Sequence, residues 1–427
     1  MSEVKVNKIS PRSGTDVTLG DSGDTFTVPT GVTLDTSNST VTLPDGSVTN
    51  AKLANSSITL NGNSVSLGGS ASIASGMFRN IIINGDMSIS QRGTSFTGLG
   101  DTNSQYTLDR FKWVEEGATD TAEYTVSQST DVPTGQGFSK SLKIDCTTAD
   151  TSVDANNIQY IGTAIEGQNL QYLKYGTSNA ESTTLSFWVR SNKTGTYGVA
   201  LISNDSTEYL YSQTYTINSA DTWEKKTLTF VGDTSANFDD DNGNSLLIQW
   251  YLVAGTNKSS GSSQTWGSYT QANRAAGQTV NLADSTSNEW YITGIQLEAG
   301  TTASDFEFLP HDVNKNRCLR YYYVHAEGNA KQIGNAGYYS NSYITSSIQF
   351  PIEMRASPSV VTTSGTNYYN IYRNNASDNF DGTWGIQQPT TFAAGIDATT
   401  GASGTAGQYG RAVTNNASAL VAFSSEL

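Results

Sequence analysis

The first 76 residues repeat a short pattern, apolar–Thr/Ser–apolar, that limits how this part of the chain can fold. The pattern occurs at Val17–Leu19, Phe26–Val28, Val32–Leu34, Val41–Leu43, Ile58–Leu60 and Val65–Leu67. Gly, Pro, Asn or Asp separates the triplets, and alternation interrupted by turn residues predicts short β-strands. The one helical turn expected here is Asn50–Asn55. Each strand offers only two apolar side chains on one face, so a single chain cannot bury a core here. The segment is therefore either a flexible linker or a region where several chains wind together, and the regular repetition favours the second.

Large residues become frequent only after this segment, since Phe26 is the only aromatic residue before Phe78. Between residues 77 and 310 the alternation of apolar and polar residues predicts nine strands. These are Ile81–Ile83, Tyr124–Val126, Ser141–Cys146, Thr183–Arg190, Tyr197–Ile202, Glu208–Ile217, Lys225–Val231, Leu246–Val253 and Trp290–Glu298. Loop connections without helical periodicity imply antiparallel pairing in a two-sheet, jelly-roll-like sandwich. One face is expected to hold Leu185, Phe187 and Val189, and another Tyr291, Thr293, Ile295 and Leu297.

The last part of the chain predicts a second, smaller β-sandwich. Arg317–Val324 indicates an aromatic strand or a short helix-to-strand passage, and Ala419–Phe423 indicates a final buried strand. The predicted domains are residues 1–76, 77–310 and 311–427. The predicted fold class is all-β: a short-strand, intertwined N-terminal segment, a jelly-roll-like β-sandwich and a second smaller β-sandwich.

Charge and composition exclude several classes of function. The 427 residues hold 24 Lys and Arg against 39 Asp and Glu, a net charge of −15. Nucleic-acid binding is therefore not expected, because it depends on basic residues that neutralise phosphates. The sequence has no apolar stretch of about 20 residues, so no membrane-spanning helix is expected. Residues 1–10 lack the apolar core of a signal peptide. Two His leave little material for His-based metal sites or triads. Cys146 and Cys318 are compatible with a disulfide but do not require one.

Several stretches resemble one family. Residues 43–58 read LPDGSVTNAKLANSSI and residues 61–69 read NGNSVSLGG, similar to the shaft and attachment segments of bacteriophage tail fibres. Residues 80–93 (NIIINGDMSISQRG), 106–111 (YTLDRF), 186–190 (SFWVR), 223–230 (WEKKTLTF) and 295–300 (IQLEAG) resemble tail-fibre domains with a carbohydrate-binding-module-like jelly roll. Residues 316–322 (NRCLRYY) and 350–358 (FPIEMRASP) resemble the C-terminal region of many tail-fibre proteins.

This resemblance implies a non-enzymatic structural and receptor-binding protein of a virion, assembled in the host cytoplasm. Its implied partners are two further copies in a homotrimer, virion tail or baseplate proteins at the N-terminal segment, and host surface polysaccharide or lipopolysaccharide. The alternatives are a capsid-decorating fibre or other virion appendage, a polysaccharide-depolymerising tailspike, and a bacterial carbohydrate-binding adhesin. A tailspike requires a long parallel β-helix and carboxylates facing one groove, and an adhesin requires a secretion signal.

Aromatic residues with nearby short amides and carboxylates are the candidates for glycan binding. Aromatic faces stack on the apolar faces of sugar rings, while amides and carboxylates bind hydroxyl groups. The candidates are Trp266, Tyr269, Tyr338, Tyr339, Tyr368, Tyr369, Tyr372, Asn374, Asn375, Asp378 and Trp384. The alternative is that these aromatic residues fill the cores of the sandwiches or an interface between protomers.

Three groups of charged residues could carry other chemistry. The acidic run Asp239, Asp240, Asp241 and Asn242 could hold a structural calcium ion, although its spacing is not that of an EF-hand, and the alternative is a solvated turn. No other cofactor is expected. Glu115 and Glu116 could suggest a hydrolase, but adjacent strand residues point to opposite faces. Asp109 and Arg110 could form a local ion pair, bind backbone groups or bind a ligand.

Overall fold

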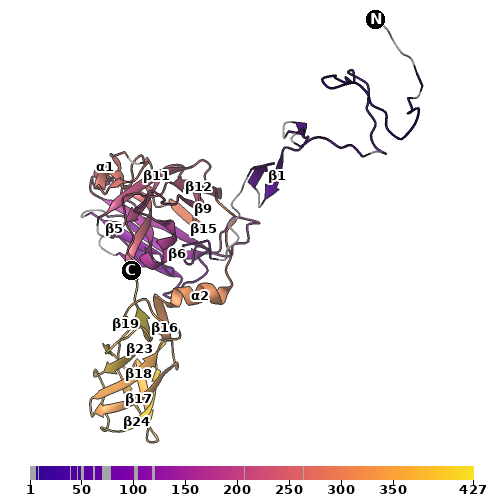
Figure 1. Cartoon of the computed structure of the whole chain (residues 1–427). Helices are drawn as coiled ribbons and strands as arrows, with labels where there is room; N and C mark the ends of the chain where they lie inside the picture. Colours follow the sequence, from indigo (N-terminus) through magenta and orange to yellow (C-terminus); the bar gives the residue numbers. More distant parts are fainter. Residues whose placement is uncertain are drawn as a thin grey trace. The chain divides into compact units, whose positions relative to one another are not determined.

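The structure of the chain is a computed structural model, and its trace is shown in Figure 1. It describes residues 6–7, 9–38, 40–45, 47–49, 52–60, 63–69, 78–100, 104–117, 121–205, 207–262 and 264–427. Contacts divide the chain into two units, Met1–Ser75 and Gly76–Leu427. Met77, where the predicted second domain begins, lies outside the described residues. The predicted domain borders remain predictions.

In the described residues of the first unit there is one hairpin, formed by β1 (Ser57–Leu60) and β2 (Asn63–Ser66). These strands pair antiparallel, with Ile58 opposite Val65. The four predicted strand triplets between residues 17 and 43 have no strand structure in the described residues. Asn50 and Ala51 of the expected helical turn lie outside the described residues, and the Lys52 amide donates to the Thr49 carbonyl at 2.9 Å.

Thirteen large apolar side chains among the described residues of this unit are exposed, and Phe26 is the most exposed at 68%. The others are Val6, Ile9, Val17, Leu19, Val28, Val32, Leu34, Val41, Leu43, Val48, Leu53 and Ile58. In the described residues, one chain alone gives the four triplets between residues 17 and 43 no neighbouring strand and no core, which explains why these four are unpaired. Winding with further chains remains a prediction.

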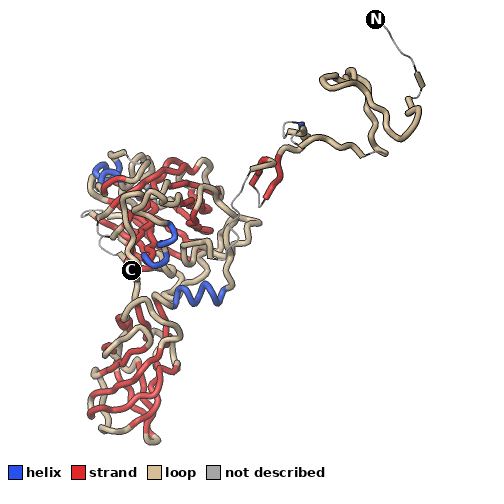
Figure 2. Tube along the Cα trace, in the orientation of Figure 1, coloured by secondary structure: helices blue, strands red, loops and turns tan. Residues whose placement is uncertain are grey.

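The second unit begins with a large β-sandwich of two antiparallel sheets. Strands are its predominant secondary structure, as Figure 2 shows. The first sheet has the order β14-β11-β10-β13-β8-β5-β4 and the second β12-β9-β15-β7-β6-β3. The strand bounds are β3 Ser95–Leu99, β4 Gln105–Tyr106, β5 Lys112–Glu116, β6 Glu123–Ser129, β7 Ser141–Thr148, β8 Ile158–Glu166, β9 Thr183–Ser191, β10 Gly195–Ser203, β11 Tyr209–Ile217, β12 Glu224–Phe230, β13 Asn244–Ala254, β14 Gly267–Ser268 and β15 Glu289–Ala299. Short helices in its loops are η2 Gly167–Asn169, η3 Gln171–Leu173, α1 Thr256–Ser259, η4 Gln271–Asn273 and η5 Leu282–Asp284.

Side chains of both sheets bury a common core that includes Trp113, Trp250 and Trp290. Eight of the nine predicted strands are present. The exception is Ile81–Ile83, which lies in a loop, although Ile81 and Ile82 are buried in this core.

The face predicted for residues 291–297 is wrong in its first half. Trp290 and Ile292, rather than Tyr291 and Thr293, lie in the core together with Ile295 and Leu297. The pairing of β15 with β9 is interrupted by a bulge between Thr293 and Gln296. An extra residue in a strand exchanges the two faces beyond it, and simple alternation misses the change.

The chain continues through α2 (His311–Leu319) into a smaller sandwich (Figure 1). Its sheets have the orders β16-β25-β19 and β21-β20-β24-β17-β18-β23-β22. The bounds are β16 Tyr322–Glu327, β17 Gln332–Ser340, β18 Tyr343–Gln349, β19 Ser359–Thr362, β20 Tyr369–Arg373, β21 Ala376–Phe380, β22 Trp384–Gln387, β23 Ala393–Ala398, β24 Tyr409–Thr414 and β25 Leu420–Ser424. The helix-to-strand passage, the final buried strand and the all-β fold class are therefore confirmed. In the part of the chain that the structure describes, no helix is long and apolar enough to cross a membrane.

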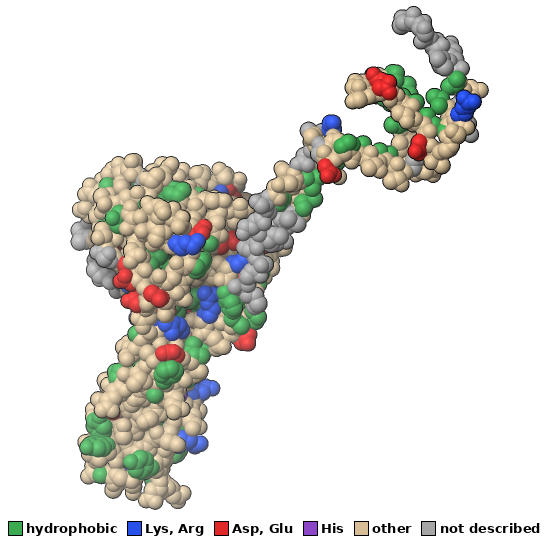
Figure 3. All heavy atoms as spheres, in the orientation of Figure 1, with side chains coloured by type: hydrophobic (Ala, Val, Ile, Leu, Met, Phe, Trp, Pro, Cys, Tyr) green, Lys and Arg blue, Asp and Glu red, His purple; other side chains and the backbone are tan. Residues whose placement is uncertain are grey.

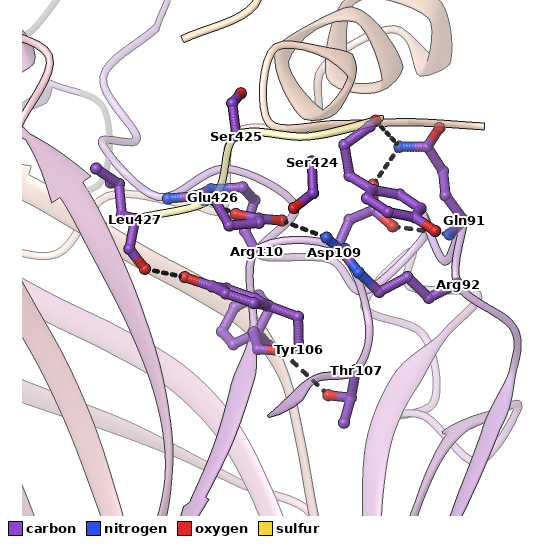
Figure 4. Close-up of polar contacts among 12 residues, drawn as sticks. Gln91, Arg92, Tyr106, Thr107, Asp109, Arg110, Ser424, Ser425, Glu426 and Leu427 are labelled. Atoms are coloured by element: carbon purple, nitrogen blue, oxygen red, sulfur yellow. Dashed lines mark hydrogen bonds and ion pairs between the residues drawn. The ribbon is translucent and has the colours of Figure 1, made fainter. Parts of the chain in front are cut away.

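The C-terminal residues that follow β25 bind the large sandwich, as Figure 4 shows. Arg110 is 1% exposed, and its guanidinium pairs with the Glu426 carboxylate and donates to the Ala164 carbonyl at 2.6 Å. Arg92 Nη2 binds the same carboxylate at 3.0 Å. The two sandwiches are thus joined by a buried charge cluster, which we call the Glu426 cluster (Arg92, Arg110 and Glu426).

A second charge cluster, built on the buried Glu166 and the half-buried Arg320, joins the same two sandwiches. Arg320 donates to both carboxylate oxygens of Glu166 at 2.9 and 2.7 Å, and the Tyr321 hydroxyl also donates to this carboxylate. Burial by itself would raise the pKa of Glu166, but these hydrogen bonds and the Arg320 charge outweigh it and hold that pKa below its usual value. The orientation of the small sandwich is therefore set by directional contacts.

Asp109 and Arg110 bind different partners at this junction. Asp109 Oδ1 accepts from the Gln91 amide at 2.7 Å, and Gln91 Nε2 donates to Asp109 and to the Tyr322 carbonyl. Asp109 and Arg110 form no ion pair with each other in the described chain. The alternative that they bind backbone groups is borne out, because Asp109 accepts from the Gln91 backbone amide and Arg110 donates to the Ala164 carbonyl.

Candidate functional site

Two residues in the left-handed region shape the end of the small sandwich. Asn374 and Asn375 have φ values of 43° and 57° and connect β20 to β21. Positive φ at both central residues is typical of the two-residue hairpin turn, and Asn tolerates it better than most residues. The turn makes Tyr372 and Ser377 direct cross-strand neighbours, and both side chains are exposed.

Tyr409 adds a second aromatic side chain beside this hairpin. It stands opposite Gly337 in the pairing of β24 with β17. A Cβ atom at Gly337 would lie 2.5 Å from two carbons of the Tyr409 ring. The ring therefore lies against the glycine backbone, yet Tyr409 remains 75% exposed. A glycine is required at 337 for this placement.

The two tyrosines border an open depression of about 610 Å³. Its lining residues are Tyr372, Arg373, Asn374, Asn375, Ala376, Ser377 and Tyr409. Tyr372 is 46% exposed, and the Arg411 guanidinium carbon lies 5.1 Å from the centre of its ring. We call this area, with Arg411, the Tyr372–Tyr409 surface.

Directly beneath the surface, Arg373 joins several polar groups. Its guanidinium binds the Asp378 carboxylate and Gln408, and lies 5.1 Å from the centre of the Tyr338 ring. The Tyr338 hydroxyl donates to Asp378 at 3.3 Å. Burial, followed by the nearby Asp378 charge, raises the pKa of Tyr338. These contacts hold the hairpin in place and leave Asp378 paired.

The structure separates the predicted glycan-binding residues into several groups. Tyr372, Asn374 and Asn375 come together at the depression, with Asp378 beneath it. Buried in the small core are Tyr338, Tyr369 and Trp384, which are at most 3% exposed. Tyr368 is half-buried against the same core.

The remaining predicted aromatic residues lie elsewhere. Tyr339 is 79% exposed and packs edge-on against Tyr343, at 5.6 Å between ring centres. Trp266 packs against the large core, and its indole donates to the Val231 carbonyl at 2.7 Å. Tyr269 is half-buried on the outer side of the seven-stranded sheet of the large sandwich.

Sequence reasoning missed Tyr409, Arg411 and Gly337. A signal for the first two was present, because alternation in Tyr409–Thr414 places residues 409 and 411 on one face of a strand. Nothing local indicates that Gly337 faces Tyr409, because 72 positions separate them in sequence.

The acidic run forms a turn near the junction of the two sandwiches. Asp241 accepts from the Gly243 amide at 2.7 Å, and Asn242 exchanges hydrogen bonds with Arg355. Gln171 donates to the carbonyls of Phe238 and Asp239. Among the described residues, no three His, Cys, Asp or Glu side chains, those of Asp239, Asp240 and Asp241 included, gather in a group that could hold a metal ion.

Other groups considered in the sequence have structural partners. Glu116 pairs with Arg274 through both carboxylate oxygens, at 2.6 and 3.0 Å. Glu115 is buried while Glu116 is half-buried, as expected for opposite faces of a strand. Cys146 and Cys318 are both buried, and no disulfide joins them.

No family model matches the chain, and no curated protein sequence matches it. Similar solved structures include the enzymatically active domain of tailspike protein 4 of bacteriophage CBA120, at 13% identity and a TM-score of 0.27. That match covers 52% of this chain, which spans only 21% of the tailspike chain. A structure described as "CBM4 structure and function" is 15% identical over 51% of this chain and 97% of its own, with a TM-score of 0.26. The family 11 carbohydrate-binding module of a Clostridium thermocellum cellulase is 10% identical over 48% of this chain and 95% of its own, with a TM-score of 0.24. Likeness at this level carries no argument about ligand or activity.

Proposed function

We propose that this chain is a non-enzymatic receptor-binding protein of a phage tail fibre that attaches the virion to host surface glycans. The observation that carries the proposal is the Tyr372–Tyr409 surface, where two exposed tyrosines border an open depression lined by Asn374, Asn375 and Ser377. An aromatic ring is a stacking platform for the apolar face of a sugar. Amide and hydroxyl groups beside it can donate to and accept from sugar hydroxyls.

A binding role rather than a hydrolytic role is supported by the lining of this depression. Glycoside hydrolysis generally requires two carboxyl groups that flank the bond to be cleaved. The seven residues that line the depression include no Asp or Glu, and the nearby Asp378 carboxylate is paired with Arg373. Incubation of the protein with host polysaccharide should therefore release no new reducing ends, whereas a depolymerising tailspike would release them.

Attachment within a virion is proposed for the first unit. Its thirteen exposed large apolar side chains between Val6 and Ile58 have no core in one chain. Burial of apolar surface between chains is a strong driving force for association, and a homotrimer would provide that burial. Three linked copies of a weak glycan site would also bind a polysaccharide surface at high effective concentration. The capsid-decorating fibre is the alternative location.

The test is binding of the full-length protein to an array of bacterial capsular and lipopolysaccharide O-chain polysaccharides. Tyr372→Ala and Tyr409→Ala should each weaken binding about tenfold, since a stacked ring contributes about 1.4 kcal/mol. Tyr409→Phe keeps the ring and should bind nearly as well as the wild type.

The matched control is Phe392→Ala, which removes an aromatic side chain that is 60% exposed in the loop between β22 and β23. It should leave binding unchanged. Equal losses in all three alanine variants, or no binding of the wild type to any polysaccharide, would contradict the proposed function.

A further inference from the structure

The charge of the small sandwich differs from that of the rest of the chain. The whole chain carries a net charge of −15, whereas residues 311–427 contain seven Lys and Arg and seven Asp and Glu. The negative charge therefore belongs to residues 1–310. On the face shown in Figure 3, uncharged polar side chains and backbone cover most of the second unit.

Arg411 is an exposed cation at the Tyr372–Tyr409 surface. Its guanidinium lies 5.1 Å from the centre of the Tyr372 ring and, within the described chain, makes no ion pair or hydrogen bond. The other cation of the surface, Arg373, is already bound by Asp378 and Gln408. Arg411 is thus the one cation of this surface that is free to bind an anion.

The sheet register places Arg411 among exposed, uncharged side chains. Across the strands it stands between Tyr372 on β20 and Asn335 on β17. Tyr409 lies two residues earlier on the same face of β24. None of these three neighbours is acidic, so no neighbouring carboxylate on the sheet face neutralises the guanidinium.

We propose that the Tyr372–Tyr409 surface binds acidic glycans, with Arg411 holding an oxyanion of the sugar. A ring stacked on Tyr372 or Tyr409 brings its substituents close to Arg411. A guanidinium offers two parallel donors to a carboxylate or a phosphate, and such charge-assisted pairs are stronger than neutral hydrogen bonds. This inference rests on the proposed glycan-binding function and specifies the class of its ligand.

The same cation also explains how a strongly negative protein can approach a negative surface. Like charges repel over roughly 8 Å at physiological ionic strength. A neutral small sandwich with a free guanidinium reduces that repulsion at the place of contact. Binding should therefore weaken as salt is added, because salt screens the attraction between an exposed cation and its anion.

The experiment compares paired polysaccharides on one array with the full-length protein. One set pairs uronic-acid capsular polysaccharides with their carboxyl-reduced forms, and a second pairs phosphate-bearing lipopolysaccharides with their dephosphorylated forms. The wild type should prefer the acidic member of one set by about tenfold or more. The set that shows the preference identifies whether the anion is a carboxylate or a phosphate.

Variants separate the role of Arg411 from the glycan-binding function. Arg411→Gln should remove the preference while binding of the neutral member is kept, and Arg411→Lys should keep part of it. Lys331→Gln removes another exposed cation of the small sandwich and should preserve the preference. Thermal unfolding of each variant confirms that it is folded.

Three results would overturn the inference. The wild type could bind both members of every pair equally, or Arg411→Gln could retain the preference; in both cases glycan binding itself would stand. Failure of the wild type to bind any polysaccharide would instead refute the proposed function and the inference with it.

Discussion

Glu426→Gln should destabilise the protein strongly, because it removes the anion that two arginines share at the junction of the sandwiches. The carboxylate pairs with Arg110, whose side chain is 1% exposed, and with Arg92 at 3.0 Å. The substitution leaves the buried Arg110 without its anion. Removing one partner of a buried pair typically costs about 3–5 kcal/mol.

That cost is large compared with the total stability of a protein, about 5–15 kcal/mol. With roughly 2–4 °C for each kcal/mol in a cooperative unit of about 150–250 residues, the midpoint of thermal unfolding of the joined sandwiches should fall by about 10 °C. Differential scanning calorimetry of the full-length protein measures this directly.

Glu181→Gln is the matched control, because Glu181 pairs with Lys174 at 2.8 Å while their side chains are 46% and 51% exposed. An exposed pair of this kind contributes less than about 1 kcal/mol, so the midpoint should hardly move. Arg110→Met combined with Glu426→Gln removes both charges and should recover part of the loss. A Glu426→Gln midpoint equal to that of Glu181→Gln would refute the description of the Glu426 cluster as a buried, stabilising contact.

Three further predictions concern pH, shape and assembly. Because the pKa of Glu166 is held below its usual value, its pairing with Arg320 stabilises the fold fully above about pH 4.3. This stabilisation is lost as the pH falls through the folded-state pKa, so the wild type should lose more stability in acid than Glu166→Gln does. Equal losses of stability in acid would contradict this prediction. Gly337→Ala would place a Cβ atom 2.5 Å from the Tyr409 ring, so it should displace that ring and weaken glycan binding. Gly267→Ala is the control, because a Cβ atom at that position meets no atom within 4 Å, and it should leave glycan binding unchanged. Mass measurement of the purified full-length protein should give three copies, and a stable folded monomer would remove the explanation for the exposed apolar side chains of the first unit.

Alternation predicted eight strands of the large sandwich correctly, because apolar and polar residues alternate along them even where both faces are buried, as in β9 and β15. Leu185, Phe187 and Val189 lie in the core as alternation requires. Ile81 and Ile82 are also buried, but the Ile81 amide reaches the Leu297 carbonyl from a loop rather than a strand. The burial of Ile81 and Ile82 was predictable from their apolar side chains. Whether their backbone belongs to a strand was not, because strand pairing depends on which distant segment lies beside them.

The candidate site was less predictable, since it depends on contacts between distant strands. Tyr369, Trp384 and Tyr372 are all aromatic residues in polar stretches of sequence. The sheet nevertheless buries Tyr369 and Trp384 in the core and leaves Tyr372 exposed to solvent. The Tyr409 ring lies against the sheet because Gly337 on another strand leaves room for it. Neither fact follows from the residues near each tyrosine, because both depend on register.

The polar character of the junction has a functional reason under the proposed function. Apolar replacements of buried ion pairs are often neutral or stabilising, so stability alone does not account for Arg110 and Glu426. Arg110 binds the Glu426 carboxylate and the Ala164 carbonyl together, which fits one orientation of the small sandwich. Linked sites gain from multivalency only where geometry lets them engage the surface together. Glu426→Gln, at a temperature where it remains folded, should therefore weaken binding to a dense polysaccharide surface while leaving affinity for a single soluble oligosaccharide unchanged. Equal losses in both assays would show that the junction supports the site itself rather than its orientation.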